Sequence, residues 1–283
     1  MRRVCFYHAG CPDGFGAAWA VARAWRGRGE FVPRGHEDEL HAEDFAGSLV
    51  VFVDIAPPIE VLRDLGEAAA QLVVLDHHVS ARDRVAADTA LENALAAEGH
   101  RIHFDLDHSG AVLAWQWFMP DEPLPELLRY VEDQDLWNWK LPCSEAVNAA
   151  IGSYPRRFDV WDELAARPVA ELAAEGEPIV RSQRIEVERS LQAVHPVCLG
   201  ELRVEAVNAR HLRSAIGHEL AKRAAYGVPC GLVYRLAGDR VDVSLYSVGD
   251  VDVSRIAAGY GGGGHRNAAG FSVRLRQWLE RFV

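Results

Sequence analysis

The chain has 283 residues, 49% of them hydrophobic and 25% charged, and its formal net charge is -11. This composition suits a globular protein of one large or two smaller domains, and it argues against broad capture of long nucleic acid, which needs a basic face. We find no apolar run long enough for a membrane span and no signal-peptide pattern, and the five scattered cysteines lack a C-x-x-C pair. These features favour a cytoplasmic protein without a membrane partner.

Strand-like apolar runs alternate with helix-like stretches through the first half of the chain. In chain order we expect a strand over 4–9, a helix over 13–25, a strand over 49–56, a Pro-started helix over 57–70 and a strand over 71–78. A strand over 101–107, a helix opened by Ser109 and a segment over 125–142 follow. Continuous Val, Leu and Ile strands separated by helices indicate an α/β domain with a parallel sheet covered by helices on both faces.

A charged stretch rich in Ala, Glu and Arg separates this domain from a second one. We expect a first domain over 1–150, a helical linker over 151–195 and a smaller α/β domain with a mixed sheet over 196–283. Within the second domain the pattern predicts a strand over 201–208, a helix over 212–227, a hairpin over 230–248, a helix over 252–260, a glycine run over 259–270 and a strand over 270–275.

Metal-capable side chains follow three successive strands of the expected parallel sheet. His8 leads to Asp13 after the first strand, Asp54 ends the second, and "VLDHHVS" places Asp76, His77 and His78 after the third. Each has a plain structural alternative: a core histidine, a helix cap or a polar strand exit. Parallel sheets bind ligands beyond the carboxyl ends of their strands, so the convergence favours a metal site.

The chemistry of this residue set indicates the metal and the reaction. Several Asp with His and without a Cys pair favour Mn²⁺, with Mg²⁺ and Co²⁺ as other choices. Two such ions activate a water molecule and stabilise the attacking and leaving oxygens of a phosphoryl group. The residues therefore predict hydrolysis of a phosphoester by two-metal activated water.

Four motifs in order resemble the DHH phosphoesterase superfamily, in the branch that carries the DHH-associated C-terminal domain. They are "HAGCPDGFGAA" at the N-terminus, "VDIAP", "VLDHHVS" and "GGGGHRNAAGF" near the C-terminus, and the resemblance covers essentially the whole chain. Within the superfamily the chain looks most similar to short two-domain oligoribonucleases, or nanoRNases.

The resemblance implies a role for each matching residue. It assigns catalysis to Asp76, His77 and His78, and it makes one acidic residue of "EDQD" a ligand, Asp133 or else Asp135. The implied metal ligands are His8, Asp13, Asp54, Asp76, His77 and Asp133. The implied substrate-binding residues are His78, Gly263, Gly264, His265 and Arg266.

Two positions depart from the family pattern. Cys11 stands where the first Asp of a D-x-D pair is common, so a soft thiol replaces a hard carboxylate. Tyr246 stands where relatives carry an Arg that grips a substrate phosphate, and Arg210, Arg255 and Arg266 are the candidate replacements.

Together these features predict a manganese-dependent phosphodiesterase that releases mononucleotides from short single-stranded RNA or DNA or from linear dinucleotides. The substrate would lie in a cleft between the domains. The alternatives are a cyclic nucleotide or dinucleotide phosphodiesterase, a 3′-phosphonucleotide phosphatase, and a nucleotide-sensing protein without catalysis. The sequence leaves a homodimer open.

Overall fold

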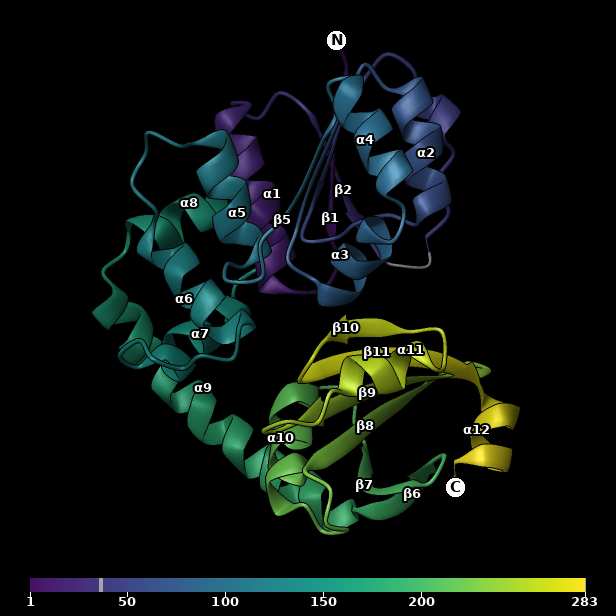
Figure 1. Cartoon of the computed structure of the whole chain (residues 1–283). Helices are drawn as coiled ribbons and strands as arrows, with labels where there is room; N and C mark the ends of the chain where they lie inside the picture. Colours follow the sequence, from purple (N-terminus) through teal and green to yellow (C-terminus); the bar gives the residue numbers. More distant parts are fainter. Residues whose placement is uncertain (36–37, 283) are drawn as a thin grey trace. The chain divides into compact units, whose positions relative to one another are not determined.

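A computed structural model of the chain describes residues 1–35 and 38–282. It divides the chain into two compact units, residues 1–180 and 181–283. Each unit is built on its own sheet, which confirms the predicted α/β fold class (Figure 1). None of the described helices is both long and apolar enough to cross a membrane.

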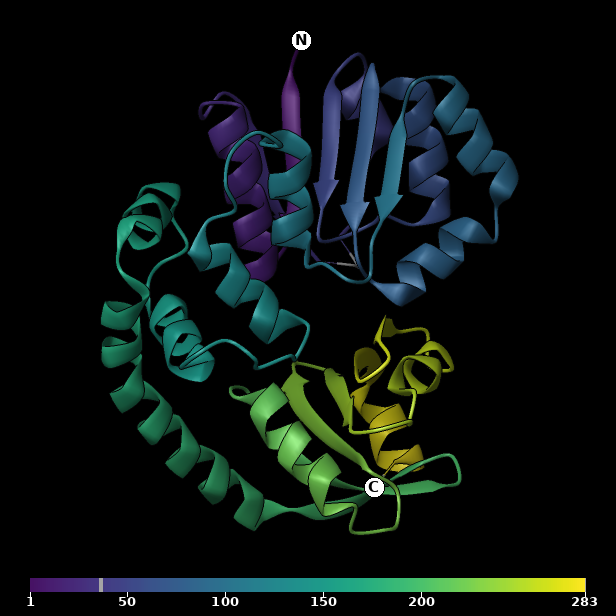
Figure 2. The ribbon, with the colours of Figure 1, turned by 60° about the vertical axis from the view of Figure 1, so that its left-hand side comes forward.

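The first unit contains a five-stranded sheet in which every pairing is parallel. Its strands are β1 (Arg3–His8), β2 (Glu30–Arg34), β3 (Leu49–Val53), β4 (Gln71–Asp76) and β5 (Arg101–Phe104). They pair in the order β2-β1-β3-β4-β5, so the predicted strands β1, β3 and β4 are adjacent at the middle of the sheet (Figure 2). Their carboxyl ends therefore meet at one edge.

Alternate residues of the central strands serve two separate hydrophobic cores. In β3, Val51 and Val53 face one core while Val50 and Phe52 face the other, as the two-residue period of a strand requires. The first core is shared with α1 (Pro12–Ala24), α5 (Gly110–Phe118) and α6 (Glu126–Asp135). The second core is shared with α2 (Ile59–Ala68), α3 (Val79–Ala86) and α4 (Thr89–Ala97). Helices thus cover both faces of the sheet.

Three further helices extend the first core beyond residue 150. They are α7 (Ser144–Ser153), α8 (Phe158–Ala166) and the start of α9 (Val169–Ser190). Ile151, Trp161 and Leu172 are almost fully buried in this core, although the sequence predicts a helical linker over 151–195. The long helix α9 contains Pro178 and runs across the boundary between the two units.

The second unit contains a six-stranded mixed sheet in the order β10-β11-β9-β8-β7-β6. Among the described strands of this second sheet, only the β7–β8 pairing is parallel. One face is covered by α10 and the other by α11 and α12. The elements are β6 (His195–Leu199), β7 (Leu202–Asn208), α10 (Arg213–Arg223), β8 (Cys230–Ala237), β9 (Arg240–Ser247), α11 (Val253–Ala258), β10 (Gly263–His265), β11 (Ala268–Arg274) and α12 (Leu275–Arg281), with 3₁₀ turns at η1 (Ala42–Phe45) and η2 (Leu191–Ala193).

Several elements were not predicted from the sequence. The edge strand β2 contains Pro33 and mostly exposed side chains, so it lacks the apolar run of a central strand. Helix α4 has a clearer signal, because Asp88 caps its first turn while Leu91 and Leu95 are buried one turn apart. The glycine run, for which the sequence predicts neither helix nor strand, includes the edge strand β10, which pairs with β11.

Candidate metal centre in the first unit

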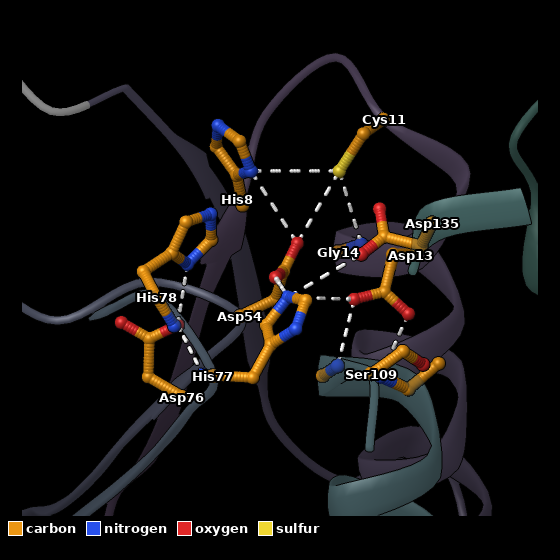
Figure 3. A network of polar contacts seen from close by, with 12 residues as sticks. His8, Cys11, Asp13, Gly14, Asp54, Asp76, His77, His78, Ser109 and Asp135 are labelled. Atoms are coloured by element: carbon orange, nitrogen blue, oxygen red, sulfur yellow. Dashed lines mark hydrogen bonds and ion pairs between the residues drawn. The ribbon is translucent and has the colours of Figure 1, made fainter. Parts of the chain in front are cut away.

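The residues predicted at the three strand ends lie together. His8 is the last residue of β1, Asp54 follows β3, and Asp76 ends β4 with His77 and His78 directly after it. Figure 3 shows these side chains pointing toward one another from neighbouring strands. Asp54, Asp76 and His77 are each at most 2% exposed, so the carboxylates and imidazoles are buried where they need partners.

Asp54 is the centre of this arrangement. Its Oδ1 accepts a hydrogen bond from His77 Nε2 at 3.0 Å, and its Oδ2 lies 3.3 Å from His8 Nδ1. The Asp54 backbone has a φ of 57°, a left-handed conformation that is uncommon outside glycine, Asn and Asp, while its N–H donates to Leu75 O at 2.9 Å. This turn directs the side chain across the strand ends toward both histidines.

Asp13 reaches the same place from the first turn of α1. Its two oxygens accept hydrogen bonds from the N–H groups of Gly110, at 2.7 Å, and Ala111, at 3.0 Å, at the start of α5. A helix N-terminus stabilises a carboxylate because its first N–H groups have no partner within the helix. Asp13 Oδ2 also lies 3.6 Å from His77 Nε2, which connects α1 and α5 to the strand ends. Ser109 caps α5, as predicted.

Asp76 fixes the two histidines that follow it. Its Oδ1 accepts hydrogen bonds from the backbone N–H groups of His77 at 2.8 Å and His78 at 3.3 Å, and it lies 2.6 Å from His78 Nδ1. Its Oδ2 is buried and accepts no hydrogen bond from the residues that the structure describes. A buried carboxylate oxygen without a donor is costly, and a cation would satisfy it.

The structure places the two acidic residues at the end of α6 in different surroundings. The carboxylate of Asp133 accepts hydrogen bonds from the backbone N–H groups of Lys140, at 2.9 Å, and Leu141, at 3.2 Å, and so holds the loop after the helix. Asp135 Oδ2 instead lies 3.5 Å from His77 Nε2. Of the two residues that the sequence left open, Asp135 is therefore the one that joins the cluster.

Among the described residues of this unit, 1–35 and 38–180, three groups of side chains could each hold a metal ion. They are His8, Cys11 and Asp54; Asp13, His77 and Asp135; and Asp54, Asp76, His77 and His78, with ligand atoms within 4.8 Å of one another in each group. Asp54 and His77 each belong to two groups. A buried set of carboxylates and imidazoles at this spacing could bind divalent metal ions.

The electrostatics of the cluster centre on His77. Burial lowers the pKa of His77, but its hydrogen bond to Asp54 and the surrounding carboxylate charges outweigh burial and raise the pKa to about 10. Burial likewise raises the pKa of Asp54, yet the bonds with His77 and His8 prevail and hold it well below the ordinary value. Burial and the Asp54 charge raise the pKa of Asp13 and of Asp135. The carboxylates thus repel one another when no cation is bound, and two of them hold their protons more tightly as a result.

Four of the five residues predicted to bind substrate lie in the second unit, where some have structural partners, and His78 lies in the first unit. Gly264, with a φ of 138°, and Gly262 allow β10 to approach β11, since a Cβ at Gly262 would lie 2.0 Å from Gly270 O. Arg266 lies against Asp250, its guanidinium donating to the Asp250 carbonyl at 3.1 Å. Gly263 and His265 belong to β10. Close backbone packing therefore accounts for part of the glycine run.

The position of Tyr246 is explained by helix α10. The Tyr246 ring packs over Gly217, where a Cβ would lie 2.0 Å from the ring, and its hydroxyl accepts a hydrogen bond from Ser214 at 3.3 Å. Arg213, which no sequence motif marks, donates to Ser244 Oγ at 3.1 Å, two residues before Tyr246 on β9. A guanidinium is therefore present beside β9, and it comes from α10.

No family model matches the chain. A curated relative, the uncharacterized protein R106 of Acanthamoeba polyphaga mimivirus, is 26% identical over 290 residues, spanning 95% of this chain and 67% of that protein. Its name states no activity.

Two solved structures are similar over most of the chain at 12% identity. The pGpG-specific phosphodiesterase PggH from Vibrio cholerae gives a TM-score of 0.46 over 99% of this chain and 96% of that one. An exopolyphosphatase-related protein from Bacteroides fragilis gives 0.44 over 96% and 86%. Likenesses this weak establish neither an activity nor a substrate for this chain.

Proposed function

We propose that the chain is a divalent-metal-dependent phosphoesterase of the DHH type that hydrolyses phosphodiester bonds in short oligonucleotides or linear dinucleotides. The observation that supports this proposal most is that four buried side chains lie together at the carboxyl ends of three adjacent strands. They are Asp13, Asp54, Asp76 and His77. Burying this many carboxylates is unfavourable unless cations pair with them. The orphaned Oδ2 of Asp76 fits the same explanation.

The ligands in this proposal follow the geometry of the cluster. The metal-binding residues are His8, Asp13, Asp54, Asp76, His77 and Asp135, with Asp135 taking the place first assigned to Asp133. Asp54 would bridge two ion positions, because its two oxygens are directed at different histidines. The predicted ion is Mn²⁺, with Mg²⁺ or Co²⁺ as substitutes, since oxygen donors predominate.

Divalent ions held there would lower the pKa of water and neutralise charge on a phosphoryl group. The chain's own residues orient the reactants. Asp76 fixes the His78 ring through Nδ1, so the opposite edge of that ring is directed away from the carboxylate and can donate to a phosphate oxygen. His78 is 9% exposed, more than His77 or Asp76, which suits a residue that meets substrate.

The second unit would bind the nucleotide end of the substrate. Gly263, Gly264 and His265 lie on an edge strand, where backbone N–H groups can contact an anion or a base without Cβ obstruction. Arg266 is exposed near this strand, and Arg213 is the second candidate for a phosphate contact. The expected substrate is single-stranded RNA or DNA a few nucleotides long.

The test is hydrolysis of a short RNA after the protein has been stripped with EDTA and supplied with Mn²⁺. We expect mononucleotide release that requires metal. The rate of release should fall about tenfold to a hundredfold or more in Asp76→Asn and in His77→Ala. The matched control is His41→Ala, which removes a histidine that caps no helix through its side chain.

A substrate panel separates the proposal from its alternatives. It contains a linear dinucleotide, a cyclic dinucleotide, a cyclic mononucleotide and a 3′-phosphonucleotide. Preferred cleavage of one of the last three would change the substrate class but keep the metal centre. Nucleotide binding without hydrolysis under any divalent ion would contradict an enzymatic role and support a sensing protein.

A further inference from the structure

One of the metal-capable groups contains a thiol, and its three donor atoms are spaced as three ligands of a tetrahedral ion would be. Cys11 Sγ lies 3.5 Å from His8 Nδ1 and 3.3 Å from Asp54 Oδ2, and the latter two atoms are 3.3 Å apart. Figure 3 shows the three side chains converging. A tetrahedral ion bound at about 2.0–2.3 Å by N, O and S ligands has donor atoms about 3.3–3.6 Å apart. The three observed separations match this.

The local fold holds the Cys11 side chain in this position. Cys11 is the N-cap of α1, and its Sγ accepts a hydrogen bond from the Gly14 N–H at 3.2 Å. Gly14 also lets the first turn of α1 contact the end of β1, because a Cβ there would lie 2.2 Å from His8 O. Cys11 and His8 are thereby brought together by backbone packing, before any ion binds.

We propose that Cys11 is a metal ligand and that the group of His8, Cys11 and Asp54 binds a thiophilic divalent ion, Zn²⁺, Co²⁺ or Fe²⁺, in preference to Mn²⁺ or Mg²⁺. A thiolate is a soft donor, and it favours these ions over the harder ones. On coordination the Cys11 thiol gives its proton to solvent as the S–metal bond forms. The proposal rests on the metal centre of the proposed function.

The neighbouring position would take a harder ion. The groups built on His77 contain only carboxylate oxygens and imidazole nitrogens, among them Asp13, Asp76 and Asp135. Asp54 contributes Oδ2 to the thiol-containing group and directs Oδ1 at His77. The centre would therefore hold two chemically different ions that share one carboxylate.

The test is a titration of the EDTA-treated, full-length protein with Co²⁺, followed by absorption spectroscopy. A cobalt–thiolate bond gives a charge-transfer band in the near ultraviolet, separate from the visible d–d bands of Co²⁺ with other ligands. We expect this band in the wild type and in Cys198→Ser, which changes an exposed cysteine of the second unit. It should disappear in Cys11→Ser and Cys11→Asp.

Competition between ions gives a second readout that does not depend on activity. Cys11→Asp should weaken the binding of one Zn²⁺ per chain by at least about tenfold, since loss of even an outer-sphere partner costs that much. The same change should raise the affinity for Mn²⁺. Bound Co²⁺ with d–d bands but no thiolate band would overturn this inference and leave the proposed function standing. A protein that binds no Co²⁺ at all would overturn both.

Discussion

Asp133 and Asp135 are two residues apart on α6, and their different partners predict opposite effects of the same substitution. Asp135 adds a negative charge to a cluster that already contains Asp13 and Asp54, and the latter's charge helps raise its pKa after burial. We expect Asp135→Asn to stabilise the metal-free protein by about 0.5–2 kcal/mol, as removal of functional-site strain commonly does. The same change should abolish most of the rise in Tm that metal causes.

Asp133→Asn is the matched control for that experiment. Its carboxylate accepts two backbone N–H groups, and an amide can accept only with its single oxygen, so one donor loses its partner. We expect a loss of about 1–3 kcal/mol with the metal-induced rise in Tm retained. Thermal melts with and without Mn²⁺ measure both effects. If Asp133→Asn abolished the metal effect while Asp135→Asn did not, the assignment would be reversed.

The raised pKa of His77 makes the stability of the metal-free protein depend on pH. The folded state holds this proton more tightly than the unfolded chain, so the stabilisation is full below pH 6.5 and is lost as the pH rises toward about 10. The raised pKa values of Asp13 and Asp135 act in the same direction, whereas the stabilisation from Asp54 is lost only in acid. We expect the free energy of unfolding in EDTA to fall across this interval.

Urea unfolding at a series of pH values measures this fall. In His77→Gln the residue can still donate to Asp54 but cannot be protonated, so the slope should be smaller. Equal slopes in the two proteins would show that other groups cause the pH dependence.

The sequence predicts most of the side chains that form the cluster, but it does not predict the contacts that each of them makes. His8, Asp13, Asp54 and the Asp76–His78 run could be found because each ends a strand, directly follows one or opens a helix. The choice between Asp133 and Asp135 could not, since two residues along a helix turn a side chain by more than half a circle and no pattern fixed the face. The Cys11 position was visible only as a departure from a motif.

The N-terminus of α5 joins α1 to the ends of the central strands. Gly110 begins this helix, and a Cβ there would lie 2.4 Å from Asp54 Cβ and 2.9 Å from Asp13 Oδ2. We expect Gly110→Ala to cost about 1–3 kcal/mol from overpacking and to weaken metal binding by displacing both carboxylates.

Gly152→Ala in α7 is the matched control, because a Cβ at that position would meet no atom within 4 Å. It should leave stability unchanged or raise it by up to about 1 kcal/mol through helix propensity. Urea unfolding and isothermal titration with Mn²⁺ compare the two variants. Wild-type metal affinity in Gly110→Ala would contradict the tight approach of α5 to the cluster.

Helices and strands could be predicted where their burial produces a clear apolar pattern in the sequence. The central strands β1, β3 and β4 are apolar on both faces and stand out as runs. Helix α3 has only Ala81 and Val85 buried, with charged residues around them. Its apolar face is therefore too narrow to be recognised as a helical pattern in the sequence. Strand β10 is three residues of glycine and histidine, whose pairing depends on β11 and not on local preference.

The net charge of -11 limits which large partners the protein can bind. Long duplex DNA is held mainly through phosphate contacts to Lys and Arg, which an acidic surface cannot supply in number. We expect a labelled long duplex to show no binding by fluorescence anisotropy at physiological ionic strength, even with Mn²⁺ present. It should also fail to slow the hydrolysis of a short RNA. Duplex binding that weakens steeply with salt would reveal a basic surface that the overall charge conceals.

The left-handed backbone of Asp54 has a practical consequence for trapping a complex. Asn adopts that conformation about as readily as Asp does, whereas most other residues would be strained there. An Asp54→Asn protein should thus fold normally while lacking the negative charge at the centre of the metal-capable cluster. Under the proposed function, crystals of this variant soaked with a short RNA should bind the RNA without hydrolysing it, and so contain the intact complex.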